Sequence, residues 1–399
     1  MLGFPLSISL SMSLSTPHSD FIHDLAYDFY GRRIATCSGD SRVTVYNLSP
    51  SGSWLLHPGC EWQAHRGVVW RVAWAHPEFG QLLATAGADT VVHVWEEQEG
   101  GFDNRDPTPV RELQLQRRGG GASGGEAAAE AAAAAADPSA PAAPTHSRWV
   151  QKAQLTEARK SVNCLAFAPR HGGLRLAAGS ADGVVRIYEA IDVMNLNHWP
   201  MSQFFEADVR DSELGVTSIS WCGGRFEPPL LAVGGSSGRV SLWQFAESSR
   251  AWTVAVELPP HPRGVLDVSW APNVGRSFHL VASCGKDGLV RVGRVKRVAP
   301  ADGGGANAEG KVLELVGSTV LDADEDVWRL GWNVTGTTLA CSGDSGKVCL
   351  WGMEKGGGEE GEEGGEEGAE GGAAEGGAAE AGEGGGAGRE DVWVCLDKV

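Results

Sequence analysis

The sequence predicts an all-β fold, a β-propeller built from six four-stranded blades. The first observation is a strand pattern that recurs six times along the 399 residues. The second is composition, because 15 tryptophans and 56 glycines indicate many short strands joined by tight turns. The third is a hydrophobic content of 42%, which is enough for a sizeable core.

Each copy of the pattern starts at Asp or Ser, runs through a short alternating strand and ends in an aromatic residue six positions later. The copies occupy residues 40–46, 89–95, 182–188, 237–243, 287–293 and 345–351, and the fifth ends in Gly293 instead. Once one long insertion is subtracted, the copies are about 50 residues apart, close to the period of WD repeats, which have four strands per blade.

The other strands of each unit also carry aromatic markers. An upstream strand ends in an aromatic residue, at Phe29, Trp74, Phe167, Trp221, Trp270 and Trp332. A fourth strand is often opened by tryptophan, as at Trp54, Trp149, Trp199 and Trp252. Residues 391–396 alternate like a strand, so we expect the chain end to complete the sixth blade.

Composition divides the chain into a leader and one domain. Residues 1–19 lack a basic segment and a clear cleavage site, which predicts a disordered leader rather than a signal peptide. The propeller covers residues 20–399, with low-complexity insertions at about 100–146 and 355–390. These Ala-, Gly- and Glu-rich insertions cannot bury enough apolar area to offset the entropy of ordering. We therefore expect disordered loops that folding does not require.

The net charge of −18 is unevenly distributed. Ten glutamates and no basic residue lie between Glu359 and Glu383, and the rest of the chain carries about −8, so nothing favours nucleic acid as a partner. No apolar run reaches 18 residues, so no transmembrane segment is predicted. The eight cysteines form no CxxC pair and no zinc spacing, which predicts buried thiols in a reducing compartment, no metal and no cofactor.

Histidine, serine and aspartate recur together, as they do in a hydrolase triad. An active site needs them once, whereas here they follow the repeat. We interpret them as buried hydrogen-bond networks that fix each blade, and we predict no catalytic residue and no enzyme activity. The predicted network residues are His23, Asp40, His65, Asp89, Trp95, Asp182, Asp287 and Trp351.

A ligand site in the central channel is an alternative use of the fold. Four arginines in or near predicted strands could form a ring that holds a phosphate or an acidic peptide; they are Arg71, Arg186, Arg291 and Arg329. Ordinary strand-edge charge explains the same residues and is the favoured interpretation.

Three segments, residues 23–38, 69–80 and 327–332, resemble the WD-repeat family that contains the vesicle-coat protein Sec-thirteen and its nucleoporin homologue. Residues 186–196, with Trp199 after them, and residues 270–280 resemble the nucleoporin branch of that family. Residues 393–397 resemble the coat protein instead. The resemblance covers residues 23–399 apart from the two insertions.

The resemblance implies an open propeller of six blades and a non-catalytic scaffold role. In this family an α-helical scaffold nucleoporin supplies a seventh blade in trans, within the Y-shaped complex of the nuclear pore outer ring. That role implies a place at the nuclear envelope, other Y-complex nucleoporins as partners, and support of protein and mRNA transport. The resemblance also implies a nutrient-signalling coat that regulates TOR kinase at the lysosomal or vacuolar surface. The alternative is an outer-cage propeller of the vesicle coat for ER-to-Golgi transport.

The expected partner site follows from the open ring. Unpaired strand edges are a liability unless another chain covers them. We expect the gap between the first and sixth blades to be lined by residues 24–29 and 327–332. The predicted partner-binding side chains are Leu25, Tyr27, Phe29, Trp328, Leu330 and Trp332.

Overall fold

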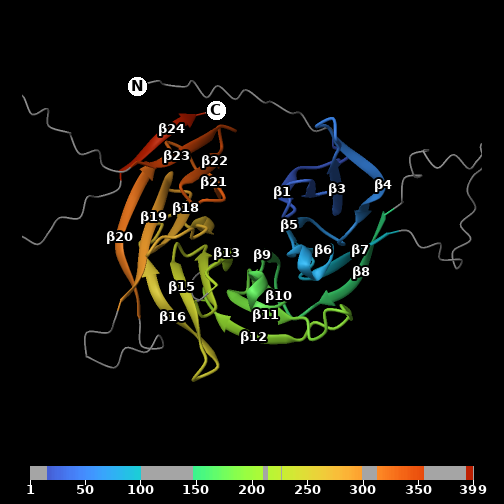
Figure 1. The fold of residues 1–399 in the computed structure, drawn as a ribbon, viewed down its shortest axis with the longest axis horizontal. Helices are drawn as coiled ribbons and strands as arrows, with labels where there is room; N and C mark the ends of the chain where they lie inside the picture. Colours follow the sequence, from blue (N-terminus) through green and yellow to red (C-terminus); the bar gives the residue numbers. More distant parts are fainter. Residues whose placement is uncertain are drawn as a thin grey trace, which may run out of the picture. The chain divides into compact units, whose positions relative to one another are not determined.

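The computed structural model describes residues 16–99, 147–209, 214–225, 227–298, 312–354 and 392–398. These residues form six four-stranded sheets, which confirms the predicted six-bladed β-propeller (Figure 1). The two low-complexity insertions and residues 1–15 of the predicted leader lie outside the described residues. The fold divides into two compact units, of which one holds blade 1 and most of blade 2, and the other holds blades 3 to 6.

The first unit is built from the strands of two blades. Blade 1 consists of β1 (Ile22–Tyr27), β2 (Arg33–Ser38), β3 (Arg42–Leu48) and β4 (Trp54–Gln63). Blade 2 consists of β5 (Val69–Trp74), β6 (Leu82–Gly87), β7 (Val92–Glu99) and β8 (Ser147–Leu155). Because side chains alternate along a strand, one face of each sheet is apolar. Ala35, Cys37 and Val45 of blade 1 pack on Leu83 and Trp95 of blade 2 in this way.

The second unit repeats the same order of strands. Blade 3 has β9 (Val162–Phe167), β10 (Arg175–Ser180), β11 (Val184–Glu189) and β12 (Met201–Glu206), and blade 4 has β13 (Val216–Trp221), β14 (Leu230–Gly235), β15 (Val240–Ala246) and β16 (Ala251–Leu258). Blade 5 has β17 (Val265–Trp270), β18 (His279–Gly285), β19 (Leu289–Val298) and β20 (Val312–Asp322), and blade 6 has β21 (Val327–Trp332), β22 (Thr338–Gly343), β23 (Val348–Glu354) and β24 (Val392–Lys398). Strand β24 pairs with β23, which confirms that the chain end completes the sixth blade.

Neighbouring blades of the second unit share apolar cores and lie side by side in Figure 1. The aromatic residue that ends a first strand also joins two blades. The indole of Trp221 in β13 donates to the carbonyl of Ala166 in β9 at 3.0 Å, and Trp332 in β21 donates to Ser269 in β17 at 3.1 Å. The predicted aromatic pattern therefore marks residues that lock one blade onto the blade before it.

Two aromatic assignments need correction. Strand β1 ends at Tyr27, and Phe29 lies in the turn that follows, so Tyr27 is the sixth residue of its strand, as Trp74 is in β5. Trp199 does not open the fourth strand of blade 3, which starts two residues later. Its indole donates instead to the carbonyl of Leu196 at 2.9 Å, within the preceding loop.

Blade 5 lacks the aromatic residue of its repeat because other side chains fill that volume. A Cβ atom at Gly293 would lie 3.1 Å from the side chain of Leu258 in blade 4 and 3.5 Å from that of Leu315. Seven of the eight cysteines are buried free thiols, and Cys395 is exposed. The helices of the described residues are two single turns, Pro77–Phe79 and Arg170–Gly172, and neither could span a membrane.

Candidate partner interface

Blade 5 contains a hydrogen-bond network that the sequence analysis did not single out. The ring of His261 is 0% exposed, with Nδ1 2.9 Å from Asp287 Oδ1 and Nε2 2.9 Å from Ser283 Oγ. Arg291 donates to the second oxygen of Asp287 at 2.9 Å. Burial lowers the pKa of His261 against the opposing effect of the carboxylate, so the ring is neutral at pH 7. His261 lies 26 residues before Asp287 in the chain, and this spacing could have identified it from the sequence.

Blade 1 uses His18, not the predicted His23, for this contact. Nδ1 of His18 lies 3.0 Å from Asp40 Oδ2, and Nε2 lies 2.9 Å from Thr36 Oγ1. The His18 side chain is 1% exposed although it falls within the leader predicted to be disordered. The leader prediction is therefore wrong for residues 16–19, because this histidine satisfies the first network.

A β-bulge explains why His23 is elsewhere. The register of β1 against β2 shifts between Ile22 and Asp24, which places His23 in a bulge. A bulged residue is turned away from the regular alternation of its strand. The ring of His23 packs on Trp70 instead, with centroids 4.6 Å apart.

Blade 2 keeps the predicted arrangement around a threonine. Nε2 of His65 lies 2.8 Å from Thr85 Oγ1, and the indole of Trp95 donates to the same oxygen at 3.0 Å. Asp89 lies in the turn between β6 and β7 and accepts from the backbone of Val91 at 3.4 Å.

Blade 3 replaces the histidine with an ion pair. Arg186 contacts both oxygens of Asp182, at 2.7 and 3.2 Å, and the backbone of Arg159 donates to the same carboxylate at 3.1 Å. Burial raises the pKa of Asp182, but these donors outweigh burial, and the pKa is lowered.

Blades 4 and 6 carry an acid where other blades carry histidine. Asp208 accepts from the backbone of Ser237 at 3.1 Å, and Glu325 accepts from the backbone and hydroxyl of Ser345 at 2.7 and 2.8 Å. Trp351 is buried in the core that blade 6 shares with blade 5. The networks differ in chemistry from blade to blade but hold the same turn each time, which supports a structural role for them.

The alternative arginine ring is not a set of unpaired cations. Arg71 lies 3.6 Å from Asp24, and Arg186 and Arg291 form the ion pairs with Asp182 and Asp287 described above. Each of these arginines is already matched by a carboxylate, which favours the strand-edge interpretation.

The first strand of blade 1 is far more exposed than the first strands that other blades cover. Ile22 at its first position is 43% exposed, whereas the matching valines of β5, β13, β17 and β21 are at most 1% exposed. Leu25 at the fourth position is 47% exposed, and its counterpart Val72 is 4% exposed. Tyr27 at the sixth position is 57% exposed, and its counterpart Trp270 is 6% exposed.

The strand register explains this exposure. Tyr27 lies opposite Ile34, which lies opposite Tyr46, so these side chains share one face of the sheet. The other face, with Ala35 and Val45, packs on blade 2. Within the first unit no blade covers the face that carries Leu25, Tyr27, Ile34 and Tyr46. We call these four residues the open face of blade 1; Leu25 and Tyr27 are its exposed members, whereas Ile34 and Tyr46 are 3% and 1% exposed.

A buried hydroxyl also lies on the open face. Tyr46 is 1% exposed, and its Oη has no hydrogen-bond partner among the described residues. Burial, with a smaller effect of Glu61, raises the pKa of Tyr46 to about 12.

Comparison with known proteins gives the family. A family model for the WD domain, G-beta repeat, matches residues 10–47, 57–96, 149–189 and 316–352. Nucleoporin SEH1 of Danio rerio is 37% identical over 352 residues, which covers 86% of this chain and 83% of that protein. Nucleoporin SEH1 of Homo sapiens is 36% identical over 353 residues, which covers 86% of this chain and 84% of that protein. The chain belongs to the SEH1 family of WD-repeat nucleoporins. Nucleoporin SEH1-A of Xenopus laevis shows the same likeness, with 37% identity over 353 residues, 86% of this chain and 84% of that protein.

In this SEH1-family chain the predicted partner residues of β21 do not share one environment. Leu330 and Trp332 pack on the core with blade 5, so two of the three side chains are already covered. Trp328 is 47% exposed, and its indole donates to Asp344. A register shift between Val327 and Arg329 separates Trp328 from the alternation of the strand.

On blade 1 the structure brings Leu25 and Tyr27 together on the open face. Phe29 is 65% exposed but lies in the turn after β1, where its ring packs on Tyr30 and His76 at 5.2 and 4.7 Å. Phe29 is therefore at the rim of the open face and not on it.

Proposed function

We propose that this SEH1-family chain is a non-catalytic scaffold subunit of the nuclear pore outer ring, where it binds an α-helical nucleoporin. The family supports the place in the pore, and the open face of blade 1 supports the binding mode. The observation that carries the proposal is the exposure of Ile22, Leu25 and Tyr27 at positions that are buried or half-buried in the first strands of the other blades.

The partner supplies a further blade that packs on the open face. Leu25 and Tyr27 then lose their solvent exposure, as the matching residues of blade 2 do against blade 1. Apolar burial of this kind contributes about 25 cal/mol per Å² removed from water. The backbone edge of β1, which pairs only with β2, offers further hydrogen bonds to a partner strand.

The exposed Trp328 of blade 6 stays a predicted contact of the same partner. We also propose that this face serves a nutrient-signalling coat at the lysosomal or vacuolar surface, because the family resemblance implies a role in such a coat. All three relatives named above carry the nucleoporin name, which favours the pore over the vesicle coat.

Purification of the tagged full chain from its own cells tests this function. We expect α-helical nucleoporins of the Y-shaped complex to co-purify and to stay bound in 1 M salt, because an apolar interface is insensitive to charge screening. Recovery of vesicle-coat subunits without nucleoporins would contradict the proposal. Loss of the nucleoporins at high salt would contradict the apolar mode of binding.

A further inference from the structure

Four polar side chains form a cluster that takes no part in the blade networks. Cys222 follows β13 in blade 4, and its Sγ lies 3.9 Å from Nδ1 of His279, the first residue of β18 in blade 5. Nε2 of His279 lies 3.4 Å from Oε1 of Glu227, and the other oxygen of Glu227 accepts from Arg297. The order thiol, imidazole, carboxylate places a base beside a nucleophile and an anchor behind the base.

The cluster is shielded from water and carries charge. The side chains of His279 and Glu227 are 7% and 21% exposed, and Cys222 is 5% exposed. Burial lowers the pKa of His279, but its contacts with Cys222 and Glu227 outweigh burial and raise the pKa to about 9. Arg297 and His279 lower the pKa of Glu227 against its burial, so Glu227 is a carboxylate at neutral pH. Because this pKa lies above 7, the His279 ring is protonated at pH 7 and is able to donate a proton from Nδ1.

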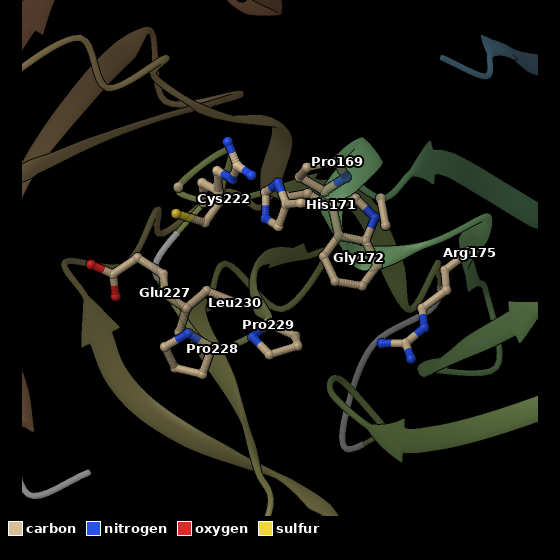
Figure 2. A pocket seen from close by; sticks show the side chains of 13 residues that line it. Pro169, His171, Gly172, Arg175, Cys222, Glu227, Pro228, Pro229 and Leu230 are labelled. Atoms are coloured by element: carbon tan, nitrogen blue, oxygen red, sulfur yellow. The ribbon is translucent and has the colours of Figure 1, made fainter. Parts of the chain in front are cut away.

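A cavity of about 330 Å³ adjoins Cys222 and Glu227. Figure 2 shows these two residues on one side of it, with His171 and Arg175 on the other and Pro228 and Pro229 below. Proline rings, together with the indole of Trp221, make part of its wall apolar, and the basic lining residues are His171, Arg175 and Arg225. Such a lining suits a small molecule with an apolar body and a polar carbonyl end.

We propose that Cys222 is a reactive thiol that adds covalently to α,β-unsaturated carbonyl compounds held in this cavity. The sulfur forms a bond to the β-carbon of the compound as its carbon–carbon double bond opens, and the protonated ring of His279 gives the proton on Nδ1 to the α-carbon. The thiol proton of Cys222 then replaces the proton that His279 has lost. No group leaves and no electron is taken from outside, since the S–H unit adds across the double bond.

The alternative is a buried cluster that only holds the loop between β13 and β14. The two roles differ in one observable. If the cluster is only structural, Cys222 is modified as slowly as other buried thiols. If the cluster is reactive, Cys222 is modified faster than other buried thiols. The inference is independent of the scaffold role, because the cavity lies in blades 3 and 4 and not on the open face of blade 1.

N-ethylmaleimide, itself an α,β-unsaturated carbonyl compound, is the probe. The native full chain is treated at pH 7, and the rate at each cysteine is read by peptide mass spectrometry. We expect Cys222 to react about 100-fold faster than Cys284, which is 0% exposed and has no neighbouring histidine contact. Equal rates at Cys222 and Cys284 would overturn the proposal.

Two variants separate chemistry from folding. His279→Asn is expected to slow the reaction at Cys222 by about 100-fold, because the proton donor beside the sulfur is lost. Glu227→Gln is expected to slow it by about tenfold through looser positioning of the ring. The exposed Cys395 serves as internal control, since its rate should stay unchanged in both variants. An unchanged or faster rate at Cys222 in Glu227→Gln, with Cys395 unaffected, would overturn the proposal even if His279→Asn unfolds.

Discussion

Replacing Leu25 and Tyr27 together with aspartate should weaken the complex with the α-helical nucleoporin by at least about 100-fold. Both side chains lie on the open face of blade 1, so the change places two charges in the contact without disturbing a core. The melting temperature of the free chain should move by no more than about 2 °C, because exposed substitutions cost little stability. Titration of the purified partner, followed by calorimetry, measures the affinity.

A matched pair of substitutions controls for added charge. Val254 in β16 and Val316 in β20 are 46% and 58% exposed, close to the 47% and 57% of Leu25 and Tyr27. Both lie on outermost strands of the second unit in Figure 1, far along their sheets from the first strands. The double change of these valines to aspartate should leave the affinity within about twofold. Equal weakening by both pairs would mean that charge, and not the open face, controls binding.

His261→Ala should destabilise the second unit by about 3 kcal/mol, one of the largest single-residue effects in the chain. The change leaves the buried carboxylate of Asp287 and the hydroxyl of Ser283 without their ring partner. Urea unfolding followed by tryptophan fluorescence measures the change. His198→Ala is the matched control, since His198 is exposed and should cost less than about 0.5 kcal/mol. Similar losses in both variants would contradict the role of the network.

The same histidine makes the stability of the folded chain depend on pH, and the sign of this dependence follows from its pKa. Its pKa is lower in the folded chain than its ordinary value of 6.5, because burial disfavours the charged ring. The unfolded chain then binds the proton first as pH falls, so stability is present above pH 6.5 and is lost below it. Asp287, whose pKa is also lowered, adds a loss below its ordinary 3.8. His261→Gln should show a smaller fall in stability between pH 7 and 5.5 than the unchanged chain.

The sequence predicted the number of blades because a strand pattern that starts at Asp or Ser repeats in every blade, although the fifth copy lacks its aromatic residue. It also predicted the return of β24, since residues 391–396 keep a two-residue alternation beyond a low-complexity insertion. Both features are local and periodic. A period of two residues along a strand, or of one blade along the chain, can be recognised in the sequence without a structure.

The sequence did not predict which residues the bulges displace. His23 was assigned to the first network from its place near Asp40, but a bulge in β1 removes it, and His18 serves instead. A similar shift in β21 separates Trp328 from Leu330. A bulge adds one residue to a strand, so it changes the face of every side chain on one side of it without any mark in the composition.

Parts of the networks could not be predicted from the sequence because other residues replace histidine in some blades. Asp208 and Glu325 take the place of the ring in blades 4 and 6, and no search for a repeated histidine would find them. The direction in which the side chains of β21 point also could not be predicted from the sequence. The core shared by blades 5 and 6 shows that Trp332 turns toward blade 5.

Hydroxyl-radical footprinting of the free chain and of its complex with the α-helical nucleoporin tests the open face most directly. Tyr27 is 57% exposed in the free chain and should be oxidised several-fold more slowly in the complex, because the partner blade covers it. Met194, which is 90% exposed on the loop after β11, should be oxidised equally in both states. Equal oxidation of Tyr27 in the free chain and in a complex shown to be intact would contradict the binding of the partner at blade 1.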